Sequence, residues 1–249
     1  MVIRHPGLPG CLFRLMMEIV LILLYAAVMI LPRLIIIPLA VHAVVIVLSA
    51  LDYGRIPLVG LHDTFGFLAF SLGAVYSVLG WNRGRGLFTY LMIPLILLLL
   101  AGSAFSHPAV GPLPPLLRTI WFELHVMLSF VSYAMFGAGA TFGVVYLARG
   151  DADAEAAQYR LLFFGYMLFS IAMIFGGIWA QLAWGTYWLW TPKELWTTIV
   201  WFWYGLYLHA RLVKGWSGQI SSAMGVAGFV IVMFLYAGVG LLMKSSHEF

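Results

Sequence analysis

The sequence predicts an all-α integral membrane protein with about eight transmembrane helices in one bundle. Hydrophobic residues make up 63% of the 249 positions and charged residues only 9%, whereas soluble domains carry about 25% charged residues. The apolar residues form long unbroken runs, as membrane-spanning helices require. Strands of an outer-membrane barrel would instead alternate apolar and polar residues. These observations exclude a soluble globular protein, a disordered chain and a membrane β-barrel.

Eight apolar runs approach the length of about 20 residues that a membrane-spanning helix needs. The first two runs are separated only by Pro32 and Arg33, so they could also form one kinked element. The proline-rich stretch 106–115 and the charged stretch 148–159 are expected to be loops. We expect the whole chain, 1–249, to form a single polytopic membrane domain. The predicted helices cover approximately residues 15–31, 34–50, 61–80, 87–105, 120–148, 160–182, 195–213 and 219–243.

The charges favour a lipid bilayer as the surroundings and give no sign of nucleic-acid binding. The formal net charge is +4, and no basic run has the length of a nucleic-acid-binding tail. With alternating spans, seven basic residues fall on one side and six on the other, and the side with more is taken as cytoplasmic. We therefore expect a bacterial-type inner membrane, with both termini and a tryptophan-rich loop at 183–194 on the outer, periplasmic side.

Two histidines lie inside predicted spans, where ionisable residues are costly and are candidates for function. His42 is mid-span in the second helix and His209 is near the inner end of the seventh. At 1.5 Å per residue they lie roughly 12 Å and 6 Å from the inner ends of their helices. A single histidine can simply hydrogen-bond a neighbouring helix. Two imidazoles at similar depth, however, could bind one haem iron axially.

A second pair of histidines and a dense cluster of tryptophans lie at the predicted outer side. His125 is near the start of the fifth helix and His247 just beyond the eighth. Seven of the ten tryptophans fall between Trp179 and Trp203. An aromatic belt at the membrane interface would account for two or three of them. The remainder, with Gly185 allowing close approach, favour a flat apolar platform for a large planar ligand.

Residues 184–194, WGTYWLWTPKE, closely resemble the tryptophan-rich WWD segment of haem-handling proteins, whose pattern is WGxxWxWDPKE. The sequence is most similar to the CcsA (ResC-type) family of cytochrome c biogenesis proteins. Four further segments resemble that family in the same order along the chain, although each is individually less specific. They are residues 54–67 (GRIPLVGLHDTFGF), 124–133 (LHVMLSFVSY), 207–211 (YLHAR) and 242–247 (LMKSSH).

The resemblance implies that the chain binds b-type, non-covalent haem, transports it outward and presents it to the CxxCH thiols of apocytochrome c. His125 and His247 would be the outer axial ligands, and His209 an inner one. His42 is the candidate partner of His209 from its depth alone, because a companion CcsB-like membrane subunit can supply that ligand. The chain could thus be part of a cytochrome c haem lyase or synthetase. The implied haem-binding segment comprises Trp184, Gly185, Trp188, Trp190, Pro192, Lys193 and Glu194.

One residue departs from the family pattern, because Thr191 occupies the position of the family's Asp. The change removes a negative charge beside the proposed haem platform. It therefore keeps open an alternative function: a quinol-oxidising, electron-transferring subunit that retains b haem and docks to a multihaem cytochrome. The same histidines serve both functions, so the sequence does not separate them. The lone cysteine, Cys11, excludes a CxxCH motif, so the chain is not itself a c-type cytochrome.

Overall fold

The computed structural model describes residues 8–80, 86–107 and 113–238, and in these ranges the chain is helical with no strand. Its helices divide into two compact units at Pro114 and Pro115. This division lies in the proline-rich stretch, which was expected to be a loop. The all-α fold predicted from the apolar runs is confirmed.

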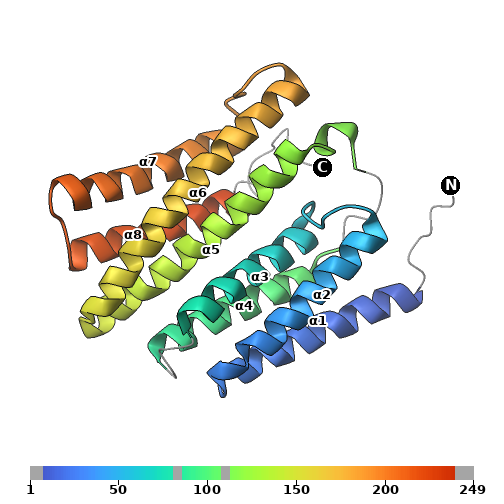
Figure 1. Ribbon diagram of the computed structural model, residues 1–249, viewed down its shortest axis with the longest axis horizontal. Helices are drawn as coiled ribbons and strands as arrows, with labels where there is room; N and C mark the ends of the chain where they lie inside the picture. The colour runs from blue at the N-terminus through green and yellow to red at the C-terminus, as the bar shows by residue number, and fades with distance from the viewer. Residues whose placement is uncertain (1–7, 81–85, 108–112, 239–249) are drawn as a thin grey trace. The chain divides into compact units, whose positions relative to one another are not determined.

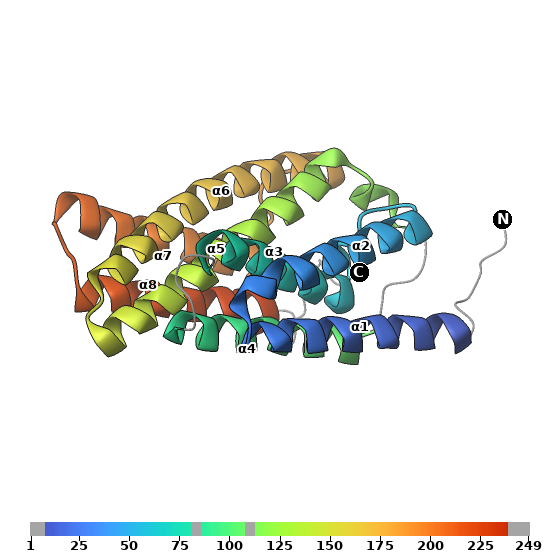
Figure 2. The same ribbon diagram turned by 60° about the horizontal axis from the view of Figure 1, so that its bottom comes forward.

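The N-terminal unit contains α1 (Leu8–Val28), α2 (Ile36–Tyr53), α3 (Leu61–Gly80) and α4 (Leu87–Phe105) (Figure 1). A short 3-10 turn, Pro32–Ile35, reverses the chain so that α2 packs against α1. The alternative of one kinked helix across Pro32 is therefore wrong. Proline at the start of that turn suits a tight reversal, because its ring fixes φ and it lacks an N–H. Figure 2 shows α1 alongside α4, which also packs against α3.

The C-terminal unit contains α5 (Ile120–Arg149), α6 (Ala152–Trp184), α7 (Pro192–Val213) and α8 (Gln219–Met233). A π-turn, Phe234–Gly238, continues α8. The two longest helices, α5 and α6, lie side by side in both views (Figure 1; Figure 2). In turn, α8 packs against α5 and α7.

The prediction of a loop over residues 148–159 is wrong, because α5 ends at Arg149 and α6 begins at Ala152. Asp151 caps this helix: its carboxylate accepts hydrogen bonds from the N–H groups of Asp153 (3.0 Å) and Ala154 (3.4 Å). The following alanines and Glu155 are good helix formers. The high charge of the segment is typical of a loop, but acidic residues are also favoured in the first turn of a helix.

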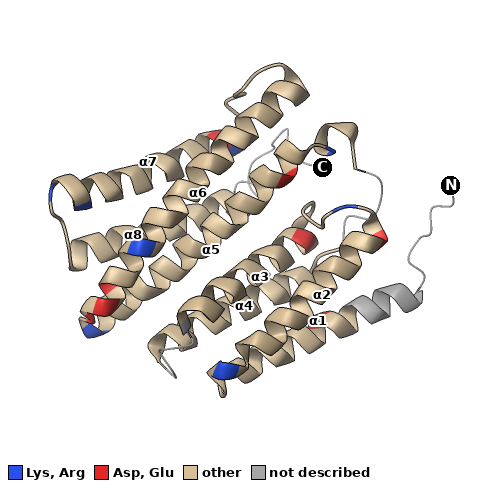
Figure 3. Cartoon of the chain, viewed as in Figure 1, with Lys and Arg blue, Asp and Glu red and all other residues tan. Residues whose placement is uncertain are grey.

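Five of the described helices are long and apolar enough to cross a membrane. They are Pro32–Tyr53, Leu87–Phe105, Ile120–Arg149, Ala152–Trp184 and Gln219–Gly238. Figure 3 shows that long stretches of these helices carry neither Lys or Arg nor Asp or Glu. The chain is therefore a multi-pass helical membrane protein, as the composition predicts.

Candidate functional site

The tryptophan-rich segment joins the end of α6 to the beginning of α7. Helix α6 ends at Trp184, and Gly185 follows in the left-handed conformation (φ 75°), with its N–H donating to the carbonyl of Gln181 at 3.0 Å. Glycine adopts this conformation without the cost a Cβ brings. The chain then leaves the helix axis, and Tyr187 and Trp190 are 64% and 69% exposed.

Helix α7 begins with a capping box, in which two residues satisfy each other's backbone groups. The Thr191 hydroxyl accepts a hydrogen bond from the Glu194 N–H at 3.3 Å. In return, the Glu194 carboxylate accepts one from the Thr191 N–H at 3.0 Å. Pro192 occupies the first helical position, where its missing N–H costs nothing. Thr191, at the position where the resembled pattern WGxxWxWDPKE has Asp, therefore serves as an uncharged N-cap residue.

Trp190 is held in an uncommon backbone conformation beside this cap. Its φ is 58°, and among the described residues it is the one non-glycine residue with positive φ. A bulky side chain in this region is strained. The same Glu194 oxygen, Oε2, accepts hydrogen bonds from the N–H groups on either side, Leu189 at 2.9 Å and Thr191 at 3.0 Å. The buried carboxylate thus stabilises the turn that exposes the Trp190 indole.

His125 lies on α5 beside the other end of the tryptophan-rich segment. Its ring stacks near Trp179, with the ring centroids 6.4 Å apart and the planes 17° apart. Trp179 in turn meets Trp184 edge-on at 4.8 Å. Gly176 allows this approach of α5 and α6, because a Cβ there would lie 2.7 Å from Nδ1 of His125. The structure therefore brings His125 and the first tryptophan of the segment into one aromatic cluster.

The hydrogen bond made by His125 determines which ring nitrogen can bind a metal. Nδ1 lies 2.8 Å from the carbonyl oxygen of Ala172, which can only accept, so Nδ1 carries the proton. In the neutral imidazole, Nε2 is then the nitrogen with the lone pair. A second partner that fixes the tautomer in this way is typical of metal-ligating histidines.

The predicted inner histidines belong to different units. His209 is exposed on α7, about 25 Å along the helix axis from the cap at Pro192, given 1.5 Å per residue. His42 lies on α2 and is only 3% exposed. Its Nδ1 is 3.4 Å from the Tyr25 hydroxyl, and its ring meets that of Phe70 edge-on at 5.5 Å. The pairing of His42 with His209 thus stays a prediction. His247 lies outside the described residues.

All residues of the implied haem-binding segment lie in the C-terminal unit. Trp188 is half-buried between the exposed Tyr187 and Leu189. Glu194 is 9% exposed, and its carboxylate is directed to the backbone of the preceding loop. The structure thus shows the capping role that a carboxylate at a helix N-terminus predicts.

Two polar clusters were missed from the sequence. In the C-terminal unit, Arg211 binds Glu155 through both guanidinium nitrogens. In the N-terminal unit, the Glu18 carboxylate accepts a hydrogen bond from Ser103 at 3.2 Å and lies 3.8 Å from Nε2 of His62. Glu18 interrupts an apolar run, and an intramembrane carboxylate is by itself a signal of function or of a buried partner. Glu155 falls in the predicted loop at 148–159, where a charged residue is ordinary and does not suggest a buried ion pair.

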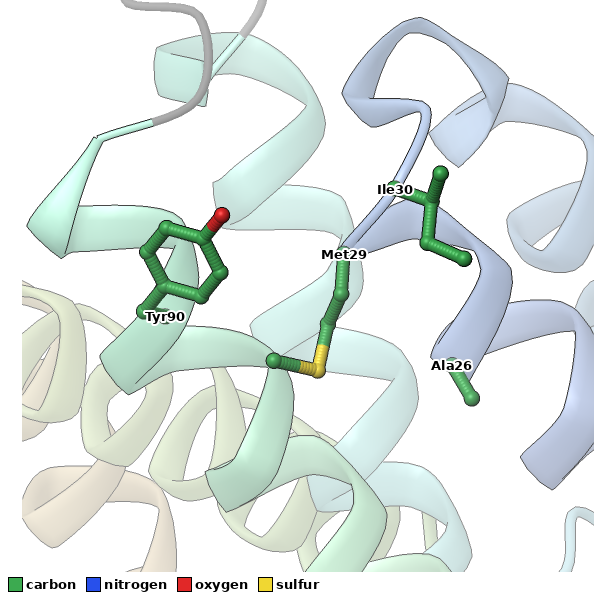
Figure 4. Close-up of a pocket in the computed structure, with 4 residues that line it drawn as sticks. All are labelled: Ala26, Met29, Ile30 and Tyr90. Carbon is green, nitrogen blue, oxygen red and sulfur yellow. The ribbon is translucent and has the colours of Figure 1, made fainter.

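A pocket in the N-terminal unit does not coincide with any predicted site residue. Its volume is about 460 Å³, and Figure 4 shows its lining side chains on α1, on the residues that follow it and on α4. Ile30 and Tyr90 at its edge are 66% and 49% exposed. The lining contains no histidine, so this pocket shares no residue with the proposed haem-binding sites. The lining residues are Ala26, Met29, Ile30 and Tyr90.

Comparison with known proteins identifies the family of this chain. The family model for cytochrome C assembly proteins matches residues 58–247, which include both His125 and the tryptophan-rich segment. Proteins named cytochrome c biogenesis protein CcsA are similar over most of the chain. That of Chlamydomonas reinhardtii is 31% identical over 79% of this chain, and the matched region is 61% of its own length.

Two further relatives of the same name extend the match. The protein of Guillardia theta is 30% identical over 80% of this chain and 78% of its own length. That of Synechococcus elongatus is 29% identical over 80% of both. The resemblance first seen in residues 184–194 is therefore confirmed over three quarters of the sequence. This multi-pass helical chain belongs to the cytochrome C assembly protein family.

Proposed function

We propose that this chain binds haem for cytochrome c maturation and presents it at the tryptophan-rich segment to the CxxCH thiols of apocytochrome c. The single observation that carries the proposal is the position of His125. Its Nδ1 proton is donated to Ala172, and its ring lies in an aromatic cluster that reaches Trp184. The family match and the names of the relatives support the same role.

The side chains at the outer site have the chemistry that haem requires. Bound haem supplies an iron that accepts axial nitrogen ligands and a flat apolar macrocycle. His125, through Nε2, and His247 would bind the iron. Trp184, Trp188 and Trp190 would cover the macrocycle, and the Lys193 ammonium would attract its carboxylates. The haem is proposed to be b-type, held without a covalent bond to this chain.

The inner site is proposed to use His209. Its imidazole is exposed on α7 among apolar neighbours, Phe202 and Leu206, which are 63% and 55% exposed. A polar ring on such a face favours a covering partner, since a membrane would solvate it poorly. The second ligand would be His42 or a histidine of a CcsB-like companion subunit. The tryptophan-rich loop and both termini are assigned to the outer side of a bacterial-type inner membrane.

The test measures haem content and reduced-minus-oxidised spectra of the full chain purified in detergent. His125→Ala is expected to lose the outer haem and keep the inner one, and His209→Ala to do the reverse. His107→Ala is the matched control, because this exposed histidine lies at the beginning of the proline-rich stretch 106–115 and outside both proposed sites. Unchanged spectra in both site variants would overturn the assignment of the ligands.

The same preparation separates the proposed function from the alternative. Substoichiometric haem that transfers to a CxxCH peptide supports maturation. Stoichiometric haem that added quinol reduces would overturn it in favour of an electron-transfer subunit docked to a multihaem cytochrome. The capping role of Thr191 does not separate the two functions, because the cap of the segment is intact and both functions use the same segment.

A further inference from the structure

Trp190 is fixed by a carboxylate that lies four residues further along the chain. One oxygen of Glu194 accepts the N–H groups of both residues that flank the tryptophan, at 2.9 and 3.0 Å. Glu194 is 9% exposed, whereas Trp190 is 69% exposed. A buried acceptor thus holds the backbone on both sides of an outward-directed indole.

The conformation of Trp190 needs such support. A φ of 58° is rarely adopted by a residue with a bulky side chain, and it persists only where the surroundings hold it. Hydrogen bonds to a charged carboxylate are stronger than those between neutral groups. Without Glu194, the peptides flanking Trp190 would lose their shared acceptor, and the residue would relax toward negative φ. The indole would then leave its present direction.

The capping box of α7 and the support of Trp190 share the hydrogen bond from the Thr191 N–H to the Glu194 carboxylate. The capping box adds the bond from the Glu194 N–H to the Thr191 hydroxyl. The support of Trp190 adds the bond from the Leu189 N–H to the Glu194 carboxylate. At the other end of the loop, Trp184 is packed against Trp179. The loop is thus held at both ends, and Trp190 lies between Trp188 and the helix.

We infer that Glu194 is a positioning residue for haem binding, which acts by holding Trp190 in the left-handed conformation that directs its indole outward. This inference rests on the proposed function, because haem is the ligand the indole would cover. It changes the role of Glu194 from a residue that contacts haem to one that acts through its neighbour.

The experiment titrates the full chain in detergent with haemin and follows the absorbance. Glu194→Ala is expected to weaken binding about tenfold, by the loss of a charge-assisted pair of hydrogen bonds. Glu194→Gln keeps an acceptor oxygen and is expected to remain within about twofold of wild type. Asp153→Ala is the matched control, since it removes an exposed acid from the first turn of α6. It should leave binding unchanged.

Trp190→Gly tests whether Glu194 acts through the indole, because glycine adopts positive φ without strain. It should weaken binding by the same factor as Glu194→Ala, and adding Glu194→Ala to it should cause no further loss. Additive losses would overturn the inference, as would wild-type binding in Glu194→Ala. Circular dichroism of each variant checks that the helices are intact.

A second measurement does not depend on haem. The rate of oxidative labelling of Trp190, followed by peptide mass spectrometry, should change in Glu194→Ala and stay at the wild-type value in Glu194→Gln. If the wild-type chain binds no haem, the proposed function fails, and the labelling still decides whether Glu194 positions the indole. An unchanged labelling rate in Glu194→Ala would overturn the inference by itself.

Discussion

The two ends of α7 are each fixed by a carboxylate, but the two carboxylates receive different donors. At the N-terminal end, Glu194 accepts from two backbone N–H groups within five residues of itself. At the C-terminal end, the carboxylate of Glu155 on α6 accepts hydrogen bonds from the guanidinium of Arg211, which is 56 residues away. It also accepts one from the N–H of Gly218 at 3.1 Å. Arg211 also lies 4.9 Å over the ring of Tyr159.

The difference separates two tasks. The local cap determines the conformation of the loop before the helix, and so the direction of Trp190. The long-range ion pair joins α6 and α7 to the turn that starts α8. The loop before α7 is thus shaped by short-range hydrogen bonds, whereas the other end of the helix is held by a long-range ion pair. The effects of substitutions at the two ends on stability and on binding should therefore differ in size and in kind.

The largest effect on stability is expected from Arg211→Ala. The Arg211 and Glu155 side chains are 18% and 14% exposed, so the variant leaves a largely buried carboxylate without its cation. We expect a loss of about 2–3 kcal/mol in the free energy of unfolding. Thermal unfolding in detergent measures it, with exposed Lys214→Ala as the control for loss of a positive charge. Equal midpoints for the two variants would remove the ion pair from this role.

A double-mutant cycle sharpens the same point. Glu155→Ala and Arg211→Ala should together cost less than the sum of the single variants, because the second substitution removes the charge that the first left unpaired. Strict additivity would mean that the two residues stabilise α6 and α7 independently.

Glu194→Ala is expected to have the next largest effect, a loss of about 1–2 kcal/mol. The variant leaves the N–H groups of Leu189 and Thr191 without their acceptor, but the exposed loop lets water replace part of it. Thermal unfolding again measures the loss. If Glu194→Ala lowers the free energy of unfolding more than Arg211→Ala does, the N-terminal end of α7 contributes more to stability than the C-terminal end, contrary to this prediction.

Trp190→Gly is expected to stabilise the fold by about 1 kcal/mol, since glycine relieves the strain of positive φ. Trp190→Ala removes the same indole and keeps the Cβ, so it should bring no such gain. A tryptophan retained where glycine is more stable points to a role for the indole in binding. If the alanine variant is as stable as the glycine variant, backbone strain at Trp190 does not explain the difference in stability.

The smallest change is expected for Thr191→Asp, below about 0.5 kcal/mol, because Asp and Thr both serve as N-cap residues. The variant restores the family's charge without altering the cap. Haemin titration then isolates the effect of that charge near Lys193. A loss of stability above about 1 kcal/mol would contradict the capping role of Thr191.

Much of the fold could be predicted from local patterns. The helices at 61–80 and 87–105 have the predicted bounds. The beginning of α6 differs from the prediction although its signal is local: Asp151 is an N-cap residue and the first turn is acidic, but the same charged composition is also typical of a loop. The sequence did not decide between one kinked helix and two helices across Pro32, because proline allows both a kink and a turn. The packing of α2 on α1 decides for two helices.

The candidate site shows the same division. The motif at 184–194 identifies the tryptophans, the cap and the family, because these depend on residues close together in the chain. The approach of His125 to Trp179, its hydrogen bond to Ala172 and the positive φ of Trp190 could not be predicted. The first two need α5 and α6 to be packed at a defined register, and the third needs the Glu194 side chain in place.

By itself, the sequence determined that this is a helical membrane protein of the cytochrome C assembly family, with a tryptophan-rich segment beside a capped helix. Hydrophobic run length and local capping chemistry act over a few residues, so they can be read directly from the chain. Only the tertiary structure decided which nitrogen of His125 is free to bind a metal and which charge meets Arg211. Those contacts join residues 47 and 56 positions apart, and helix packing brings them together.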